Sequence, residues 1–129
     1  MDISKDIKKE LEQLIETGKK LFNALIPDEK EECKDILFFF KNYDLWYSKA
    51  IIIVKQLVPE RFDDFKNQYK NEKRKEIKYS TYTISDALRG ISHRDGYYNP
   101  SSAIYCMNSQ LNILKGCLET FERQQLYFG

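Results

Sequence analysis

The sequence lacks three features that would direct a protein to a membrane or to nucleic acid: a long apolar run, an apolar leader and an excess of charge. Its 129 residues include 21 basic and 20 acidic side chains, so the formal net charge of +1 provides no overall basic field. The longest apolar runs, ILFFF and AIIIV, are far too short to span a bilayer. The N-terminus MDISKDIKKELEQ has no apolar core of the signal-peptide kind. We therefore expect a cytoplasmic protein without a membrane partner.

Groups that ligate metals or carry out catalysis are also scarce. The chain has one histidine and three cysteines, and it contains no EF-hand, P-loop, GxGxxG, HExxH or CxxC motif. Cys106 and Cys117 fall on one predicted helix, about 16 Å apart along its axis. Disulfide-bonded Cα atoms lie within about 7 Å, and two ligands of one zinc ion must also lie close together. We therefore predict no metal and no cofactor, and we interpret the cysteines as small apolar core residues.

Helical spacing of apolar residues, in contrast, covers most of the sequence. Prolines separate the periodic stretches, because proline cannot continue a helix and the residue before it disfavours the helical conformation. This pattern predicts an all-α fold, a helical bundle of about four main helices plus one short helix, in a single domain of residues 1–129. The main helices are predicted at residues 3–25, 28–57, 60–70 and 100–121. The acidic residues at 28–32 are interpreted as partners of the helix dipole.

The stretch from Arg74 to Gly96 is interpreted as a structured connector. Apolar and polar residues alternate near residues 76–82, which predicts a short extended segment and a brief β-bridge. Thr83 followed three residues later by Asp86 has the pattern of a capping box, and Gly90 fits a helix end. We therefore predict the short helix at residues 84–89, where it closes one end of the bundle.

Aromatic residues are unusually concentrated in the second predicted helix, and the last helix has the cleanest heptad pattern. One helix cannot turn all of its rings toward a single neighbour, so we expect some to face a second chain, where Tyr and Trp are favoured. We expect the partner to be a protein, and we prefer a second copy of the same chain, which would give a homo-oligomer. The predicted interaction residues are Trp46, Tyr47, Met107, Leu111, Leu114, Leu118 and Phe121, extended by Tyr127 and Phe128.

A basic run provides an alternative reading. Residues 70–78 carry five basic and two acidic side chains, a net charge of +3. Lys73, Arg74 and Lys75, with Tyr79 as a stacking ring, would suit a single-stranded nucleic acid. The simpler interpretation is a solvated connector with surface ion pairs.

Arg89 and His93 suggest a second form of this alternative. An arginine can hold a phosphate while an imidazole moves a proton. HEPN-type ribonucleases carry such a pair on one helix with four to six residues between. Here only three residues intervene and Gly90 interrupts the helix, so a degenerate HEPN-like ribonuclease is the weaker hypothesis and no catalytic residue is otherwise predicted. A solvated loop histidine is the preferred interpretation of His93.

Two stretches, YDLWYSKAIIIVKQLVPERFDDF and RKEIKYSTYTISDALRGI, carry a family resemblance, and LNILKGCLETFE fits less specifically. They resemble the N-terminal helical region of a bacterial protein family of unknown function, over roughly half of the chain. In that family the region precedes a second, HEPN-like domain, in mobile-element or phage-defence settings. The resemblance implies a non-catalytic platform. Because the sequence ends where the second domain would begin, we expect a fragment or a stand-alone version that dimerises or binds a full-length relative.

The sequence therefore predicts a non-catalytic protein–protein interaction or regulatory module in a bacterial or phage-defence setting. The alternative is an RNA-binding protein or a degenerate HEPN-like ribonuclease.

Overall fold

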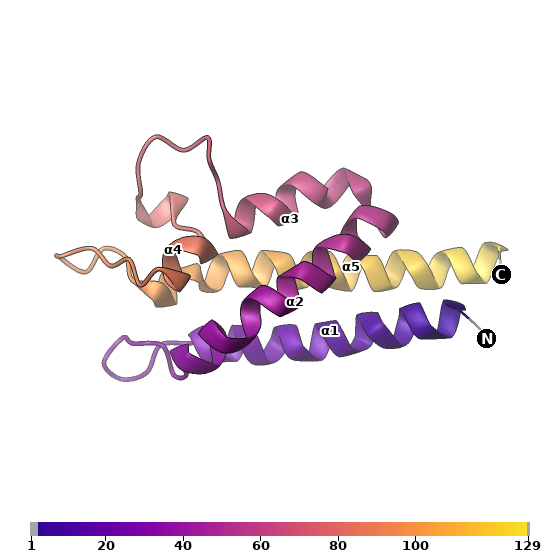
Figure 1. Ribbon diagram of the computed structural model, residues 1–129, viewed down its shortest axis with the longest axis horizontal. Helices are drawn as coiled ribbons and strands as arrows, with labels where there is room; N and C mark the ends of the chain where they lie inside the picture. Colours follow the sequence, from indigo (N-terminus) through magenta and orange to yellow (C-terminus); the bar gives the residue numbers. More distant parts are fainter. Residues whose placement is uncertain (1–2, 129) are drawn as a thin grey trace.

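A computed structural model describes residues 3–128 of the chain, and it confirms the all-α helical bundle (Figure 1). No strand occurs within these residues, and none of their helices is long and apolar enough to cross a membrane. Three short 3₁₀ turns supplement the helices, at Pro59–Arg61, Tyr79–Thr81 and Pro100–Ala103. The helices are α1 (Ile3–Leu25), α2 (Ile36–Leu57), α3 (Phe62–Tyr69), α4 (Ile84–Leu88) and α5 (Ile104–Phe128).

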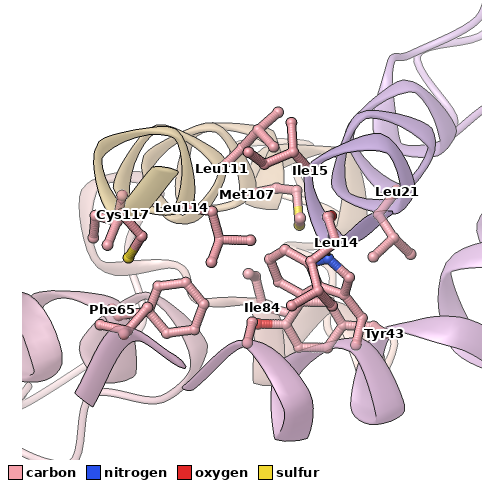
Figure 2. Packing of buried hydrophobic residues seen from close by; sticks show 14 of the residues in the cluster. Leu14, Ile15, Leu21, Tyr43, Phe65, Ile84, Met107, Leu111, Leu114 and Cys117 are labelled. Carbon is pink, nitrogen blue, oxygen red and sulfur yellow. Dashed lines mark hydrogen bonds between the residues drawn. The ribbon is translucent and has the colours of Figure 1, made fainter. Parts of the chain in front are cut away.

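The two longest helices, α1 and α5, lie side by side and antiparallel, and α2 crosses both of them (Figure 1). Helix α3 packs on α2 and α5, and the short α4 closes the end where α5 begins. An ion pair between Lys8 and Glu122, at 3.6 Å, joins the start of α1 to the end of α5. This arrangement encloses one continuous apolar core (Figure 2).

Two polar links cross the core and fix the position of α2. The Trp46 indole N–H donates to the carbonyl of Leu14 at 2.8 Å, which ties α2 to α1. The Tyr43 hydroxyl donates to the Gln110 side chain at 2.7 Å, and the Gln110 amide donates to the carbonyl of Phe65 at 3.0 Å. No buried side-chain nitrogen or oxygen among the described residues lacks a partner, so hydrogen bonds offset the desolvation of these polar groups.

Helix α2 begins at Ile36, so the predicted start at residue 28 is wrong. The Asp28 carboxylate accepts hydrogen bonds from the backbone N–H groups of Lys30 and Glu32, at 2.8 and 3.0 Å, and thereby folds this segment into a turn. Glu31 has a left-handed φ of 63°. The helix is capped instead by Asp35, whose side chain accepts from the Phe38 N–H. The acidic residues at 28–32 therefore lie in a loop and do not meet a helix dipole.

The predicted extended segment near residues 76–82 holds only at its flanks, where Lys78 and Tyr82 are extended, because its middle forms the 3₁₀ turn Tyr79–Thr81. The Thr81 hydroxyl donates to the carbonyl of Glu76 at 2.9 Å and accepts from the Lys78 N–H at 2.8 Å. These bonds satisfy the backbone locally in place of a strand partner. The isolated β-bridge in the described residues joins Pro27 to Cys33 instead.

The other predicted boundaries agree within two residues, except those of α5, which spans Ile104–Phe128 instead of residues 100–121. Thr83 and Asp86 form the capping box of α4, and Gly90 follows its end with a φ of 68°, which a side chain would disfavour. Asn99 caps the turn that leads into α5. Helix α5 continues through Gly116 to Phe128, as the unbroken spacing predicted for its first part.

Replacing Gly116 with alanine is expected to raise the free energy of unfolding by about 0.5–1 kcal/mol, because glycine is a poor helix former. A Cβ atom at this position would meet no atom within 4 Å. The matched control is Gly18→Ala in α1, where the Cβ would lie 2.9 Å from Leu111 Cδ1 and 3.2 Å from Trp46 Cζ2. Crowding there is expected to remove the gain. Urea unfolding checks both variants, and a destabilised Gly116→Ala chain would contradict the helix through this position.

Candidate interaction surface

The predicted docking face on α5 is not a surface. Five of the predicted interaction residues are buried in the core, with exposed fractions between 0% and 6%: Trp46, Met107, Leu111, Leu114 and Phe121. Helices α1 and α2 cover the heptad face of α5, where Met107, Leu111 and Leu114 point into the core (Figure 2). Tyr47 and Leu118 are half-buried and pack against the same core. The prediction that the five buried residues dock a second chain is therefore wrong, whereas for Tyr47 and Leu118 it stays a prediction.

The end of α5 retains little of the predicted surface. Tyr127 is exposed, together with its neighbour Leu126. The side chain of Phe128 lies outside the described part of the chain. Two exposed apolar residues at one helix end are common on protein surfaces and indicate no site.

Helix α2 exposes the large apolar side chains that the core does not take up. Leu37 is 64% exposed, Phe40 39%, Leu45 64% and Ile52 58%. At 100° per residue they fall on the side of α2 opposite to its buried residues, which include Phe39. We call these four residues, with Lys41 and Ser48 between them, the outer face of α2.

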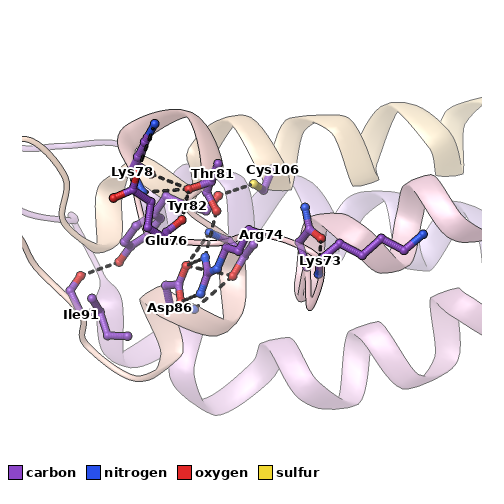
Figure 3. A network of polar contacts seen from close by, with 11 residues as sticks. Lys73, Arg74, Glu76, Lys78, Thr81, Tyr82, Asp86, Ile91 and Cys106 are labelled. Atoms are coloured by element: carbon purple, nitrogen blue, oxygen red, sulfur yellow. Dashed lines mark hydrogen bonds and ion pairs between the residues drawn. The ribbon is translucent and has the colours of Figure 1, made fainter.

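The basic run does not form the predicted nucleic-acid surface, because Arg74 is engaged inside the fold (Figure 3). Its guanidinium forms a two-pronged ion pair with Asp86, one hydrogen bond being 2.6 Å long, and also donates to the carbonyl of Thr81 at 2.9 Å. The side chains of Arg74 and Asp86 are only 17% and 1% exposed. The prediction of Arg74 as a nucleic-acid contact is therefore wrong, and its role is to hold the connector onto α4.

The Asp86 carboxylate is the polar centre of this network. It also accepts hydrogen bonds from the Thr83 N–H and hydroxyl, at 2.9 and 3.1 Å. Burial by itself would raise the pKa of Asp86, but the hydrogen bonds from Arg74 and Thr83 together outweigh it and lower the pKa below its ordinary value. The same pairing raises the pKa of Arg74. Both groups are therefore charged at neutral pH, and their charges stabilise each other.

The other three predicted nucleic-acid residues point to different places. Lys73 lines a cleft of about 280 Å³ beside Lys66 and Lys70, whose wall includes the stacked rings of Tyr47 and Tyr69 at 4.5 Å. Lys75 is exposed outside this cleft, and Tyr79 meets Tyr105 edge to face at 6.1 Å. Burial raises the pKa of Tyr47 to about 12, so its hydroxyl remains protonated. Lysine side chains and aromatic rings thus share one small cleft. Of the predicted nucleic-acid residues, only Lys73 is among those that line it.

Arg89 and His93 are not brought together by any described hydrogen bond. Arg89 is exposed at the end of α4, next to Gly90. His93 lies in the following loop, where its Nδ1 accepts from the Asp95 N–H at 3.0 Å and its ring packs on Tyr97 and Tyr98. These contacts shape the loop, and none of them supplies a nucleophile or a phosphate-binding group to the imidazole.

The three cysteines are free thiols, and Cys106 and Cys117 lie on α5 as predicted. Burial is the main cause that raises the pKa of Cys33, Cys106 and Cys117 to about 11 each. A thiol with such a pKa is a poor nucleophile at neutral pH, because the thiolate is the reactive form. Within residues 3–128, no group of three or more His, Cys, Asp or Glu side chains is placed to hold a metal ion.

No family model, curated protein or solved structure matches the chain. The outer face of α2 is the clearest candidate site, because the expected surplus of apolar groups gathers there on one side of a helix.

Proposed function

We propose that the chain is a non-catalytic interaction module that associates with a second copy of itself through the outer face of α2. The observation that carries this proposal is the exposure of Leu37, Leu45 and Ile52, each by more than half, on one side of one helix. Residues of this type are usually buried, and a row of them on a helix is typical of a contact between helices.

A second copy suits this face energetically. Full burial of a Leu or Ile side chain stabilises by about 1.5–3 kcal/mol relative to full exposure. In a two-fold dimer each contact is made twice, so one short apolar face supplies two sets of buried side chains against a single cost of association. The net charge of +1 gives two copies little mutual repulsion.

The proposal extends to a cytoplasmic platform in a bacterial or phage-defence setting. The resemblance of residues 43–65 and 74–91 to a bacterial family supports this setting. In a full-length relative, self-association of the platform would bring two copies of a following domain together.

Replacing Leu45 with glutamate tests the proposal, because it places a carboxylate in the middle of the apolar face. We expect wild-type chains to sediment increasingly as dimers as concentration rises, and the variant to associate at least about 100-fold more weakly, which corresponds to about 2.7 kcal/mol. Leu126→Glu on α5 is the matched control, since it makes the same change at a leucine elsewhere that is at least as exposed. A wild-type chain that remains monomeric throughout, or a control that dissociates as readily, would reject self-association through α2.

Nucleic-acid binding is the second candidate, and the cleft between Tyr47, Tyr69 and three lysines supports it. Two features oppose it: Lys70 is paired with Glu72 at 3.6 Å, and the carbonyl end of α3 lies at the same place and disfavours an anion. We therefore expect no salt-dependent mobility shift with single-stranded RNA. A shift that Lys66→Glu abolishes would favour this candidate instead. RNA cleavage lost in His93→Ala would favour the HEPN-like ribonuclease with Arg89 and His93.

A further inference from the structure

We propose that a small cleft between the connector and α5 binds an uncharged, hydroxylated ring, which is the chemistry of a single sugar unit. The cleft has a volume of about 230 Å³ and lies where α3, the connector and the first turns of α5 meet. Its lining includes the rings of Tyr79 and Tyr105 and the hydroxyls of Ser80 and Ser109. None of these residues belongs to the outer face of α2, so this site is independent of the proposed self-association.

The lining of this cleft carries no charge. All eight of its lining residues are uncharged, although 32% of the residues in the chain are charged. Four other clefts of the described residues each include at least one lysine, among them the cleft beside Tyr47 and Tyr69. A charged ligand would lose part of its hydration here without gaining a counter-charge, so the cleft selects an uncharged one.

The polar groups of the lining are hydroxyls and one amide. Three serines, three tyrosines and Gln68 contribute them, and each of these side chains can both donate and accept a hydrogen bond. The Tyr82 hydroxyl is engaged within the fold, because it donates to the carbonyl of Ile91 at 2.7 Å. Gln68, Ser80 and Ser109, with the two exposed tyrosines, provide groups for a ligand. A ligand that matches them carries several hydroxyls, which donate and accept in the same way.

Tyr79 and Tyr105 give the cleft an apolar wall. The two residues are 54% and 65% exposed, and their rings meet edge to face, with centroids 6.1 Å apart and an angle of 72° between the planes. Tyrosine offers a large, rigid contact area at a low cost in conformational entropy, and binding surfaces often combine it with serine, as this cleft does. The angle leaves no slot between parallel faces in which a flat nucleobase would stack on both sides. The rings therefore suit the apolar C–H face of a puckered sugar ring.

The size of the cleft restricts the ligand to a single ring. Clefts that hold drug-sized ligands have volumes of about 300–1,000 Å³, and this cleft, at about 230 Å³, is smaller. A proline-rich peptide also docks on aromatic side chains, but it needs an extended groove. One sugar unit, free or at the end of a longer chain, meets the requirements of charge, hydroxyl content and size together.

The fold holds the walls of the cleft in place before a ligand arrives (Figure 3). The Cys106 thiol donates to the carbonyl of Tyr82 at 3.2 Å, which ties the connector to α5. The Arg74 guanidinium donates to the carbonyl of Thr81 at 2.9 Å, at the end of the 3₁₀ turn Tyr79–Thr81. A preformed cleft avoids the cost of ordering its walls when the ligand binds.

Titration of the chain with neutral monosaccharides tests this site. The probes are glucose, galactose, mannose and N-acetylglucosamine, each followed by amide NMR spectra up to about 50 mM, which detects dissociation constants in the millimolar range. We expect at least one of them to shift the signals of Tyr79, Tyr105 and Ser109 in a saturable way. Tyr105→Ala should weaken that binding at least about 10-fold. Tyr97→Ala is the matched control and should leave binding unchanged, since Tyr97 is 70% exposed and packs on His93 outside the cleft.

Three outcomes would overturn the sugar site. The first is the absence of a saturable shift with all four sugars. The second is a shift that Tyr105→Ala retains, because the sugar would then bind elsewhere. The third is saturable binding of adenosine or of a proline-rich peptide in this cleft, but of no sugar, which would assign the cleft to a nucleobase or to a peptide. None of these outcomes bears on self-association through α2, which sedimentation tests separately.

Discussion

Replacing Asp86 with alanine is expected to lower the free energy of unfolding by about 3–4 kcal/mol. The change leaves the Arg74 guanidinium largely buried without its partner, and removal of one member of a buried ion pair costs about 3–5 kcal/mol. The lower half of that range applies because Arg74 retains 17% exposure to water. The hydrogen bonds that Asp86 accepts from Thr83 at the start of α4 are lost as well.

Glu119→Ala provides the matched control for Asp86→Ala. Glu119 forms an exposed ion pair with Arg123 on α5, at 2.8 Å. Such surface pairs contribute about 0–1 kcal/mol, so this variant should unfold almost as the wild type does. Equal losses in the two variants, measured by urea unfolding, would contradict a structural role for the Arg74–Asp86 pair.

The pH dependence of the same variant gives an independent check. The pKa of Asp86 is lowered in the folded chain from an ordinary value near 3.8. Its contribution to stability is therefore fully present above that value and is lost as the pH falls through the folded pKa. The difference in unfolding free energy between wild type and Asp86→Ala should be constant near neutral pH and should narrow below about pH 4.

Replacing Trp46 with alanine is expected to cost about 3–5 kcal/mol of stability, as for other buried tryptophans. The indole is 2% exposed, its ring lies 6.0 Å from that of Phe65, and its N–H bonds to the carbonyl of Leu14. Truncation would open a cavity and remove the indole hydrogen bond to that carbonyl.

The neighbouring residue supplies the control for Trp46. Leu45→Ala removes an exposed side chain, so its effect on unfolding of the monomer should be within about 0.5 kcal/mol, while self-association weakens. Urea unfolding at low protein concentration separates the two variants. A Trp46→Ala chain that stays stable but no longer associates would support Trp46 as an interface residue and would contradict its burial in the core.

The sequence predicts most helix boundaries because they coincide with residues of restricted or unusual backbone freedom, or with side chains that cap a helix. Pro59 and Gly90 mark helix ends, and Thr83 with Asp86 marks the start of α4. The start of α2 was missed because no proline or glycine separates residue 28 from Ile36. The turn there is made by the Asp28 side chain, and a carboxylate that caps a turn and one that begins a helix look the same in sequence.

The interaction surface could not be located from sequence because α2 is apolar on most of its circumference. Where both sides of a helix carry large apolar residues, the pattern does not determine which side faces the core. Phe39 and Trp46 are buried, whereas Leu37 and Phe40, which are as apolar and lie on the same helix, are exposed. The side of α2 that faces the core is determined by where α1 and α5 pack. Their positions depend on contacts between residues far apart in the chain.

The internal role of Arg74 does not follow from the sequence for a related reason. Arg74 and Asp86 are twelve positions apart, across a turn and a helix start, so their pairing appears only in the folded chain. Among neighbouring lysines, an arginine with a buried carboxylate partner has no distinct signal in sequence.

A dilution series of methyl NMR spectra tests the central claim, self-association through the outer face of α2, most directly, because it maps the contact in unaltered chains. We predict that signals of Leu37, Leu45 and Ile52 shift together as concentration falls, while those of the buried Met107, Leu111 and Leu114 do not. Signals that stay constant at every concentration, or changes confined to Leu126 and the end of α5, would contradict the proposed surface.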